Sequence, residues 1–301
     1  MGYAYDYGSV SALLYAIIKE NSTSKANDWI TQRLQVTQET GALQQFNLTF
    51  TAIPRFTGKN IIRVTEEELA ILEAAIPGFT VYGWTLDALT RAWWLLQLPV
   101  TSQQAYEQAI EGLFNAAEMN ELVALYNALP LLAWPEMWQL RTAEGIRSNI
   151  GIVLSAIMLH NPYPAKYLEE PAWNQLIMKA FFTDKPVQFI IGLDARANVT
   201  LANILFDFAH ERQAAGRPVN PMQWRLIAPF INADNFPDIE RLWHSENNIE
   251  KEAAALVCAK SNYPPAQALL QQATVLRDEI AAGKLSWDTI AGRMAAAVPV
   301  S

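Results

Sequence analysis

Helix start and stop signals recur along the whole chain, and no other feature limits the possible folds as strongly. The Thr65 hydroxyl can accept a hydrogen bond from the backbone N–H of Glu68, whose carboxylate can reach back to Thr65, so the two form a capping box. Apolar residues then follow at helical spacing until Pro77. The same signals predict further helices at Thr85–Leu98, Thr101–Ala116, Glu118–Ala128, Pro135–His160, Thr200–Ala215, Asn248–Ala259 and Pro264–Ala281, and a last one capped by Ser286.

Strand signals are scarce. The segment from Asn47 to Val64 contains threonines, phenylalanines, Pro54 and Gly58, which together disfavour a helix. We predict a loop for this segment, with a short hairpin as the alternative.

Three short segments share a proline followed closely by a tryptophan: Pro135–Trp138, Pro171–Trp173 and Pro221–Trp224. Proline suits the first position of a helix, and each tryptophan can anchor its helix between neighbouring helices. Their spacing of about 40 to 50 residues is typical of HEAT-like helical pairs. No linker rich in Pro, Gly or Ser divides the chain. We therefore predict an all-α fold of stacked antiparallel helical hairpins, a HEAT-like α-solenoid, as a single array over residues 1–301.

The composition excludes several classes of protein. Hydrophobic residues make up 51% of the chain and charged residues 17%, which is far from the composition of a disordered protein. The net charge of −8 repels phosphates, so we expect neither nucleic acid nor an anionic membrane as a partner. Cys258, the single cysteine, cannot form an internal disulfide and lies in the apolar run Ala253–Ala259, so a buried thiol is expected.

No targeting or membrane segment is recognised in the sequence. The first residues lack the basic and apolar stretches and the cleavage site of a signal peptide. The longest apolar run, Ile150–Leu159, is too short to span a bilayer. We expect a cytoplasmic protein without direct membrane insertion.

Polar side chains gather on one face of the predicted helix Pro135–His160. Arg141 and Glu144 are three residues apart and can form an ion pair there. This face is either a solvated surface, with a salt bridge that contributes ~0.3 kcal/mol, or one wall of a polar groove. The opposite, apolar stripe consists of Ile146, Ile150, Val153 and Ile157.

The predicted helix Thr200–Ala215 carries a second polar stripe. Asp207 and His210 lie on it, Glu211 lies at its edge, and Arg212 projects toward the apolar side, where a carboxylate would have to meet it. Asp207 and His210 have the spacing of two metal ligands, but the sequence offers no further ligands beside them, so no metal is predicted.

Three other polar residues have two possible roles each. They either cap or join helices, or they contact a ligand. Asn174 lies on an apolar helix face and needs hydrogen-bond partners, either from a neighbouring helix or from a ligand. Asp194 and Asn198 lie in the connection after Gly192, where capping of the next helix is the favoured role.

Taken together, six blocks resemble the signature of the EboA family: Arg141–Asn149, Asn161–Pro164, Ala172–Gln175, Gly192–Asn198, Ala209–Arg217 and Trp224–Pro229. The similarity spans residues 132–230, and the first hundred residues carry no such block. The resemblance implies a metabolite traffic protein, encoded beside membrane prenyltransferase-like, sugar-phosphate-cyclase-like and TIM-barrel hydrolase-like proteins. It also implies a role in moving a secondary-metabolite precursor, as in scytonemin formation, toward the periplasm. The family has no assigned catalytic residues, so we predict none and no cofactor.

The first functional hypothesis is a non-catalytic binding or scaffold protein for a small metabolite, or for proteins of the same gene cluster. The alternative is an enzyme that uses Glu144, Asp207, His210 and an arginine for general acid–base chemistry. A purely structural role would leave the polar stripes unexplained.

We further hypothesise that polar residues of three central helices form one connected network. The candidate ligand-binding residues are Arg141, Glu144, Arg147, Asn149, Asn174, Asp207, His210, Glu211, Arg212 and Trp224.

Overall fold

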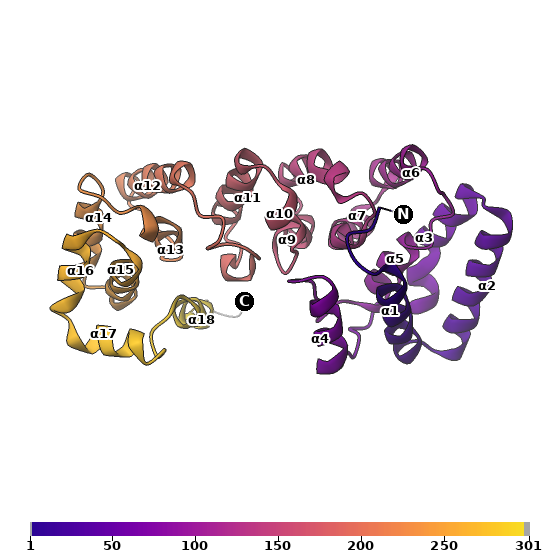
Figure 1. Ribbon diagram of the computed structural model, residues 1–301, viewed down its shortest axis with the longest axis horizontal. Coiled ribbons are helices and arrows are strands. Elements are labelled where there is room, and N and C mark those ends of the chain that lie inside the picture. The colour runs from indigo at the N-terminus through magenta and orange to yellow at the C-terminus, as the bar shows by residue number, and fades with distance from the viewer. Residues whose placement is uncertain (1, 298–301) are drawn as a thin grey trace. The chain divides into compact units, whose positions relative to one another are not determined.

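A computed structural model of the 301-residue chain describes residues 2–297 (Figure 1). Helices account for 69% of the chain, and the described residues contain no strand, so the predicted all-α fold is confirmed. Within that range, the one isolated β-bridge joins Ile61 to Thr85. None of the helices among residues 2–297 has the length and apolar character needed to cross a bilayer.

The chain divides into two compact units, with the boundary after Leu176. The first unit contains α1 (Tyr7–Asn21), α2 (Ser24–Thr40), α3 (Leu43–Thr57), α4 (Glu66–Ala75), α5 (Leu86–Leu95), α6 (Gln103–Ala116), α7 (Met119–Asn127), η1 (Leu129–Leu131), η2 (Pro135–Trp138), α8 (Gln139–Ile146), α9 (Gly151–Met158) and α10 (Tyr163–Tyr167). The boundary falls within α11 (Glu170–Phe182). The second unit continues with η3 (Val187–Phe189), α12 (Val199–Ala214), α13 (Gln223–Ile227), η4 (Ala228–Phe230), α14 (Phe236–Trp243), α15 (Asn248–Lys260), α16 (Pro264–Gln271), α17 (Thr274–Ala281) and α18 (Trp287–Ala297).

Local signals set many of the helix ends. The Thr65–Glu68 capping box opens α4 as predicted: the Thr65 hydroxyl accepts from the Glu68 N–H at 3.2 Å, and the Glu68 carboxylate accepts from the Thr65 N–H at 2.8 Å. The Asn198 side chain caps α12 by accepting from the N–H of Leu201 at 2.8 Å, which confirms its predicted capping role. The three tryptophans predicted to be buried, Trp138, Trp173 and Trp224, are 0%, 0% and 1% exposed.

The loop predicted for Asn47–Val64 is wrong over its first half, because α3 runs to Thr57. Its buried side chains return at helical spacing, so tertiary packing outweighs the weak helix propensity of threonine and phenylalanine. The Thr57 hydroxyl donates to the carbonyl of Ile53 at 3.0 Å and so stays satisfied within the helix. The buried set is Phe46, Thr49, Phe50 and Ile53.

The single helix predicted for Pro135–His160 is also wrong. The structure has η2 and α8, then a break, and then α9. At the break the Ser148 hydroxyl accepts from the N–H of Ile150 at 3.1 Å, which offers the backbone a turn in place of the helix, and Gly151 has a low helix propensity. As a result Ile150, predicted for the apolar stripe, is 39% exposed.

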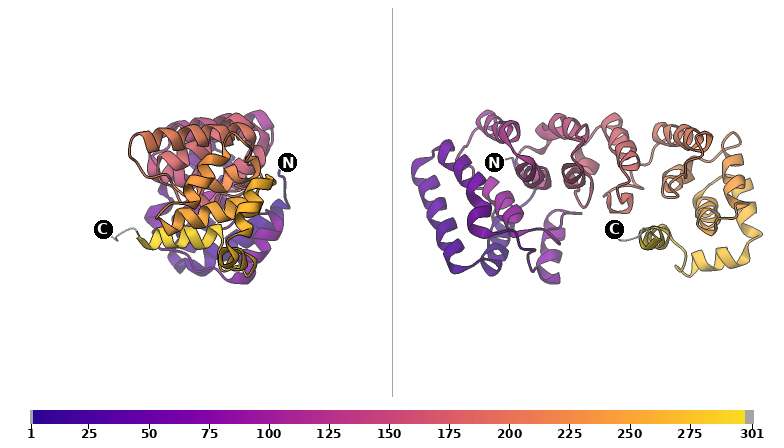
Figure 2. Two further views of the ribbon diagram at one scale, coloured as in Figure 1. Left: turned by 90° about the vertical axis from the view of Figure 1, so that its left-hand side faces the viewer. Right: turned by 180° about the vertical axis from the view of Figure 1, so that it is seen from behind.

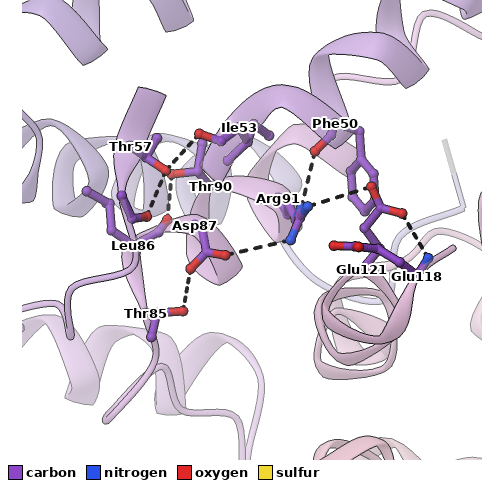
Figure 3. A network of polar contacts seen from close by, with 11 residues as sticks. Phe50, Ile53, Thr57, Thr85, Leu86, Asp87, Thr90, Arg91, Glu118 and Glu121 are labelled. Atoms are coloured by element: carbon purple, nitrogen blue, oxygen red, sulfur yellow. Dashed lines mark hydrogen bonds and ion pairs between the residues drawn. The ribbon is translucent and has the colours of Figure 1, made fainter. Parts of the chain in front are cut away.

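In the first unit α5 contacts α1, α3 and α7, and Figures 1 and 2 show it beside these helices from opposite sides. A buried guanidinium lies at the centre of this packing (Figure 3). Arg91 on α5 is 1% exposed. Its Nε donates to the carbonyl of Phe50 on α3 at 3.1 Å, and its guanidinium carbon lies 5.4 Å from the centre of the Phe50 ring. Pro54 has no N–H to donate to that carbonyl, so Arg91 supplies the hydrogen bond that the helix lacks.

Two buried carboxylates balance the charge of Arg91 (Figure 3). Its Nη1 lies 3.6 Å from Asp87 Oδ2 on α5, and its Nη2 lies 3.6 Å from Glu121 Oε1 on α7. These separations exceed hydrogen-bond length, so the attraction is Coulombic. Each carboxylate has a further donor: the Thr85 hydroxyl for Asp87 at 2.6 Å, and the Glu118 N–H for Glu121 at 3.0 Å. Burial lowers the pKa of Arg91, and the two carboxylates oppose that change.

We predict that Arg91→Met lowers the free energy of unfolding by about 3–5 kcal/mol, because it leaves two buried carboxylates without a cation. Urea unfolding followed by circular dichroism measures this loss. Adding Asp87→Asn and Glu121→Gln to the same variant should recover at least ~1 kcal/mol, because no unpaired charge remains buried. An Arg91→Met protein as stable as the parent would contradict the role of Arg91 as the cation that these buried carboxylates need.

In the second unit α15 is the central helix and contacts α13, α14, α16, α17 and α18. The helices of this unit are coloured orange to yellow in Figure 2. The residues from Ala253 to Cys258 are all buried, and the three alanines that begin this run allow neighbouring helices to approach closely. Cys258 is 1% exposed, which confirms the predicted buried thiol, and burial raises its pKa to about 12.

We predict that Cys258 in the folded protein reacts with a thiol reagent at pH 8 about a thousandfold more slowly than a free cysteine, since the thiolate is the reactive form. Absorbance after addition of an aromatic disulfide reagent measures the rate. In urea one thiol per chain should react at the ordinary rate, which serves as the control. Rapid reaction of the folded protein would show that the packing around α15 is looser than described.

Candidate ligand-binding site

The predicted pair Arg141 and Glu144 lies on α8 in the first unit. Arg141 Nη1 donates to Glu144 Oε2 at 3.1 Å, so the expected ion pair is present. The stronger attachment is to α6, where Arg141 binds both oxygens of Glu111 and donates to Asn115 Oδ1 at 3.0 Å. Because the Glu144 side chain is 68% exposed, this cluster joins α6 to α8 at the surface.

The other candidates of the first unit lie in different surroundings. Arg147 and Asn149 are exposed in the turn between α8 and α9. Asn174 on α11 is 5% exposed, as expected for an asparagine on an apolar helix face.

In the second unit, His210 on α12 bonds to Asp238 on α14, with Nε2 and Oδ2 2.9 Å apart. Asp207 and Glu211 are exposed on the same helix as His210. Among residues 2–297 there is no group of three or more His, Cys, Asp or Glu residues that could hold a metal ion. The proximity of His210 to Asp238 is therefore a contact between two helices.

The expectation that a carboxylate meets Arg212 is wrong, because its partners are a backbone carbonyl and an aromatic ring. Arg212 Nε donates to the carbonyl of Pro218 at 2.5 Å, and its guanidinium carbon lies 5.6 Å from the centre of the Phe208 ring. Trp224 is 1% exposed and its ring lies 6.0 Å from that of Phe206, so it belongs to the core. The single network hypothesised for these central polar residues stays a prediction.

A hollow of about 520 Å³ opens within the second unit, and we call it the C-terminal hollow. Its lining comes from the connection before α12 and from α13, η4, α15, α17 and α18. None of the ten candidate residues lines it. The residues that determine its chemistry are Asp194, Arg225, Leu256, Lys260, Ile280 and Trp287.

A two-bonded ion pair lies at one side of the C-terminal hollow. Arg225 Nε donates to Asp194 Oδ1 and Arg225 Nη2 donates to Asp194 Oδ2, both at 2.6 Å. The favoured capping role of Asp194 is not what the structure shows, because Asn198 caps α12 and the Asp194 carboxylate binds Arg225. The pair fixes the guanidinium plane, since both parallel bonds must be kept at once.

The remaining nitrogen of Arg225, Nη1, is buried without a hydrogen-bond partner among the described residues. Its nearest carboxylate oxygen is Asp288 Oδ1 at 3.8 Å, which is beyond hydrogen-bond length, and the Asp288 side chain is 84% exposed. A buried donor without an acceptor is unfavourable by about 1–3 kcal/mol. An oxygen supplied by a ligand would remove that cost.

A second cation and an apolar wall complete the C-terminal hollow. Lys260 is the exposed last residue of α15, and none of the ion pairs within residues 2–297 involves it. Leu256, Ile280 and Trp287 supply apolar surface. The site therefore offers two cations, one of them already paired, beside an apolar face. This arrangement suits an anion that has an apolar part.

The fold and the hollow together define an all-helical protein with a charged and apolar hollow in its second unit. A family model described as metabolite traffic protein EboA matches residues 10–228, and the chain belongs to that family. The match confirms the resemblance and extends it well before residue 132, over most of the first hundred residues in which no block was recognised. No curated protein and no solved structure matches the chain.

Sequence reasoning missed the lining of the C-terminal hollow for two reasons. Asp194 and Arg225 stand inside the blocks that carry the family resemblance, but nothing local shows that they meet across 31 residues. Lys260 and Trp287 lie beyond the matched residues and had no sequence signal. One signal could have identified Arg225 as a site residue. It is a basic residue inside a family block, and it directly follows the core residue Trp224.

We predict that Asp194→Asn and Arg225→Gln each lower the free energy of unfolding by only about 0.5–1 kcal/mol, because the Asp194 side chain is 57% exposed. A double-mutant cycle in urea should give a coupling energy in the same range. A loss of several kcal/mol would instead make the pair a structural element of the second unit.

Proposed function

We propose that this chain is a non-catalytic metabolite-binding protein that holds a small anionic molecule in the C-terminal hollow. The observation that carries the proposal is the unbonded Nη1 of Arg225 at that hollow, with Lys260 also lining it. A carboxylate or phosphate of the ligand binds these cations, and its apolar part lies against Leu256 and Trp287. The family description, metabolite traffic, supports a role in carrying such a molecule.

The geometry supports capture and release of a ligand. Asp194 already neutralises part of the Arg225 charge, so a bound anion gains moderate electrostatic attraction and can leave again. A carrier needs this reversibility, since a ligand held too tightly is not passed on. The cargo we propose is an anionic precursor of a secondary metabolite.

The architecture we propose for this role is a HEAT-like α-solenoid, in which antiparallel helices stack and leave their loops and one face free for partners. Pairwise helix contacts such as α2 with α3, α7 with α9, and α14 with α15 support it. Proteins of the same gene cluster are the proposed partners, and the cytoplasm is the proposed compartment. The net charge of −8 argues against nucleic acid as a partner.

Small molecules that copurify with the chain test the proposal. The protein is isolated from cells that contain its neighbouring pathway, and the released molecules are identified by mass spectrometry. We expect the parent to retain an anionic molecule and Arg225→Gln to retain at least about tenfold less, which corresponds to the loss of one charge-assisted contact.

Arg293→Gln is the matched control. Arg293 is an exposed arginine of α18 that pairs with Glu252, as Arg225 pairs with Asp194, but it does not line the C-terminal hollow. This variant should retain the ligand like the parent. Equal retention by Arg225→Gln and the parent, or no anion in either, would contradict the proposed function.

A further inference from the structure

A second, smaller cavity lies within the first unit, with a volume of about 250 Å³. Its walls come from the segment before α1, the end of α4, η1 and α10. We call it the tyrosine pocket. The lining residues that matter here are Tyr5, Pro77, Pro130, Tyr163, Lys166 and Tyr167.

The walls of the tyrosine pocket are held in place by backbone hydrogen bonds. The Tyr5 hydroxyl donates to the carbonyl of Leu131 at 2.7 Å, and the Tyr163 hydroxyl donates to the carbonyl of Pro135 at 2.5 Å. These bonds fix both rings. Tyr163 is 1% exposed and forms the base of the wall, whereas Tyr5 and Tyr167 are half-buried, so part of their surface remains accessible. Burial raises the pKa of Tyr163 above its ordinary value.

The shape of the pocket is further fixed by two stiff elements. The rings of Tyr163 and Tyr167 lie 4.9 Å apart, one helical turn from each other on α10. Pro77 and Pro130 present rigid apolar rings without an N–H. A pocket of this kind is complementary to a flat apolar ring, because aromatic and prolyl faces stack on such rings with little loss of side-chain freedom.

Lys166 is the only charged residue among those that line the tyrosine pocket. It is exposed, and its Nζ lies 5.2 Å from the centre of the Tyr167 ring, so the charge stands beside the aromatic wall. None of the ion pairs formed within residues 2–297 involves Lys166. Its ammonium is available to an anion whose apolar part occupies the pocket.

We infer that the tyrosine pocket is a second small-molecule site, specific for a planar aromatic carboxylate of one or two rings. The ring lies between the tyrosine and proline faces, and the carboxylate binds the Lys166 ammonium. The volume sets the size, since about 250 Å³ falls just below the usual range for drug-sized ligands. This inference does not rest on the C-terminal hollow, which shares no lining residue with the pocket.

Titration calorimetry of the full chain with three probes tests it: indole-3-carboxylate, its uncharged carboxamide, and the non-aromatic cyclohexanecarboxylate. The first should bind saturably. The carboxamide should bind about fivefold more weakly, since it lacks the ion pair with an exposed lysine. The cyclohexane acid should bind about tenfold more weakly, since it cannot stack.

Lys166→Gln should reduce the affinity for indole-3-carboxylate to that for the carboxamide and leave carboxamide binding unchanged. Because Lys166 is exposed, this variant should fold like the parent. Tyr167→Leu is a second test, since it should weaken binding of indole-3-carboxylate through the loss of stacking. Lys59→Gln, an exposed lysine elsewhere in the first unit, is the control and should change nothing. In Arg225→Gln the binding that depends on Lys166 should remain, which separates this site from any binding of the same probe in the C-terminal hollow.

Three outcomes would overturn the inference. The first is no saturable binding of indole-3-carboxylate up to millimolar concentration. The second is an unchanged affinity in Lys166→Gln. The third is loss of binding in Arg225→Gln with Lys166→Gln unaffected, which would place the probe in the C-terminal hollow.

Discussion

A buried guanidinium needs acceptors and opposite charges close by, and the packing of α3, α5 and α7 is organised by that requirement. Arg91 needs the carbonyl of α3, the carboxylate on its own helix and the carboxylate of α7, so the three helices can pack in one register only. Apolar contacts alone would tolerate small slides between helices, because they have no direction. Pro54 is part of the same constraint, since it opens the carbonyl that Arg91 uses.

Much of the fold could be predicted because the signals that begin and end a helix lie within a few neighbouring residues. A capping box such as the one at Thr65 needs only four residues, so it is visible in sequence. The errors arose where tertiary packing or a competing local hydrogen bond decides the backbone conformation. In α3, burial of Phe50 and its neighbours overrides poor propensity, and at Ser148 a side chain competes with the helix backbone. The candidate site was harder still, because the partner of Arg225 is 31 residues away and nothing local identifies it.

The two proposed sites divide the chemistry of ligand recognition differently. The C-terminal hollow has about twice the volume of the tyrosine pocket and contains a paired and an unpaired cation, so it selects for charge more than for shape. The tyrosine pocket has rigid aromatic walls and one exposed ammonium, so it selects for a flat ring and only secondarily for charge. Each proposed site therefore combines a cation with apolar surface, in different proportions.

The family model ends at residue 228, and the residues that line the C-terminal hollow lie on both sides of that boundary. Asp194 and Arg225 belong to the matched part, while Leu256, Lys260 and Trp287 come after it. A chimera that keeps residues 1–228 and takes its later helices from another family member would keep the Asp194–Arg225 pair and replace Leu256, Lys260 and Trp287. Ligand retention by such a chimera would show which side of the hollow sets the proposed preference.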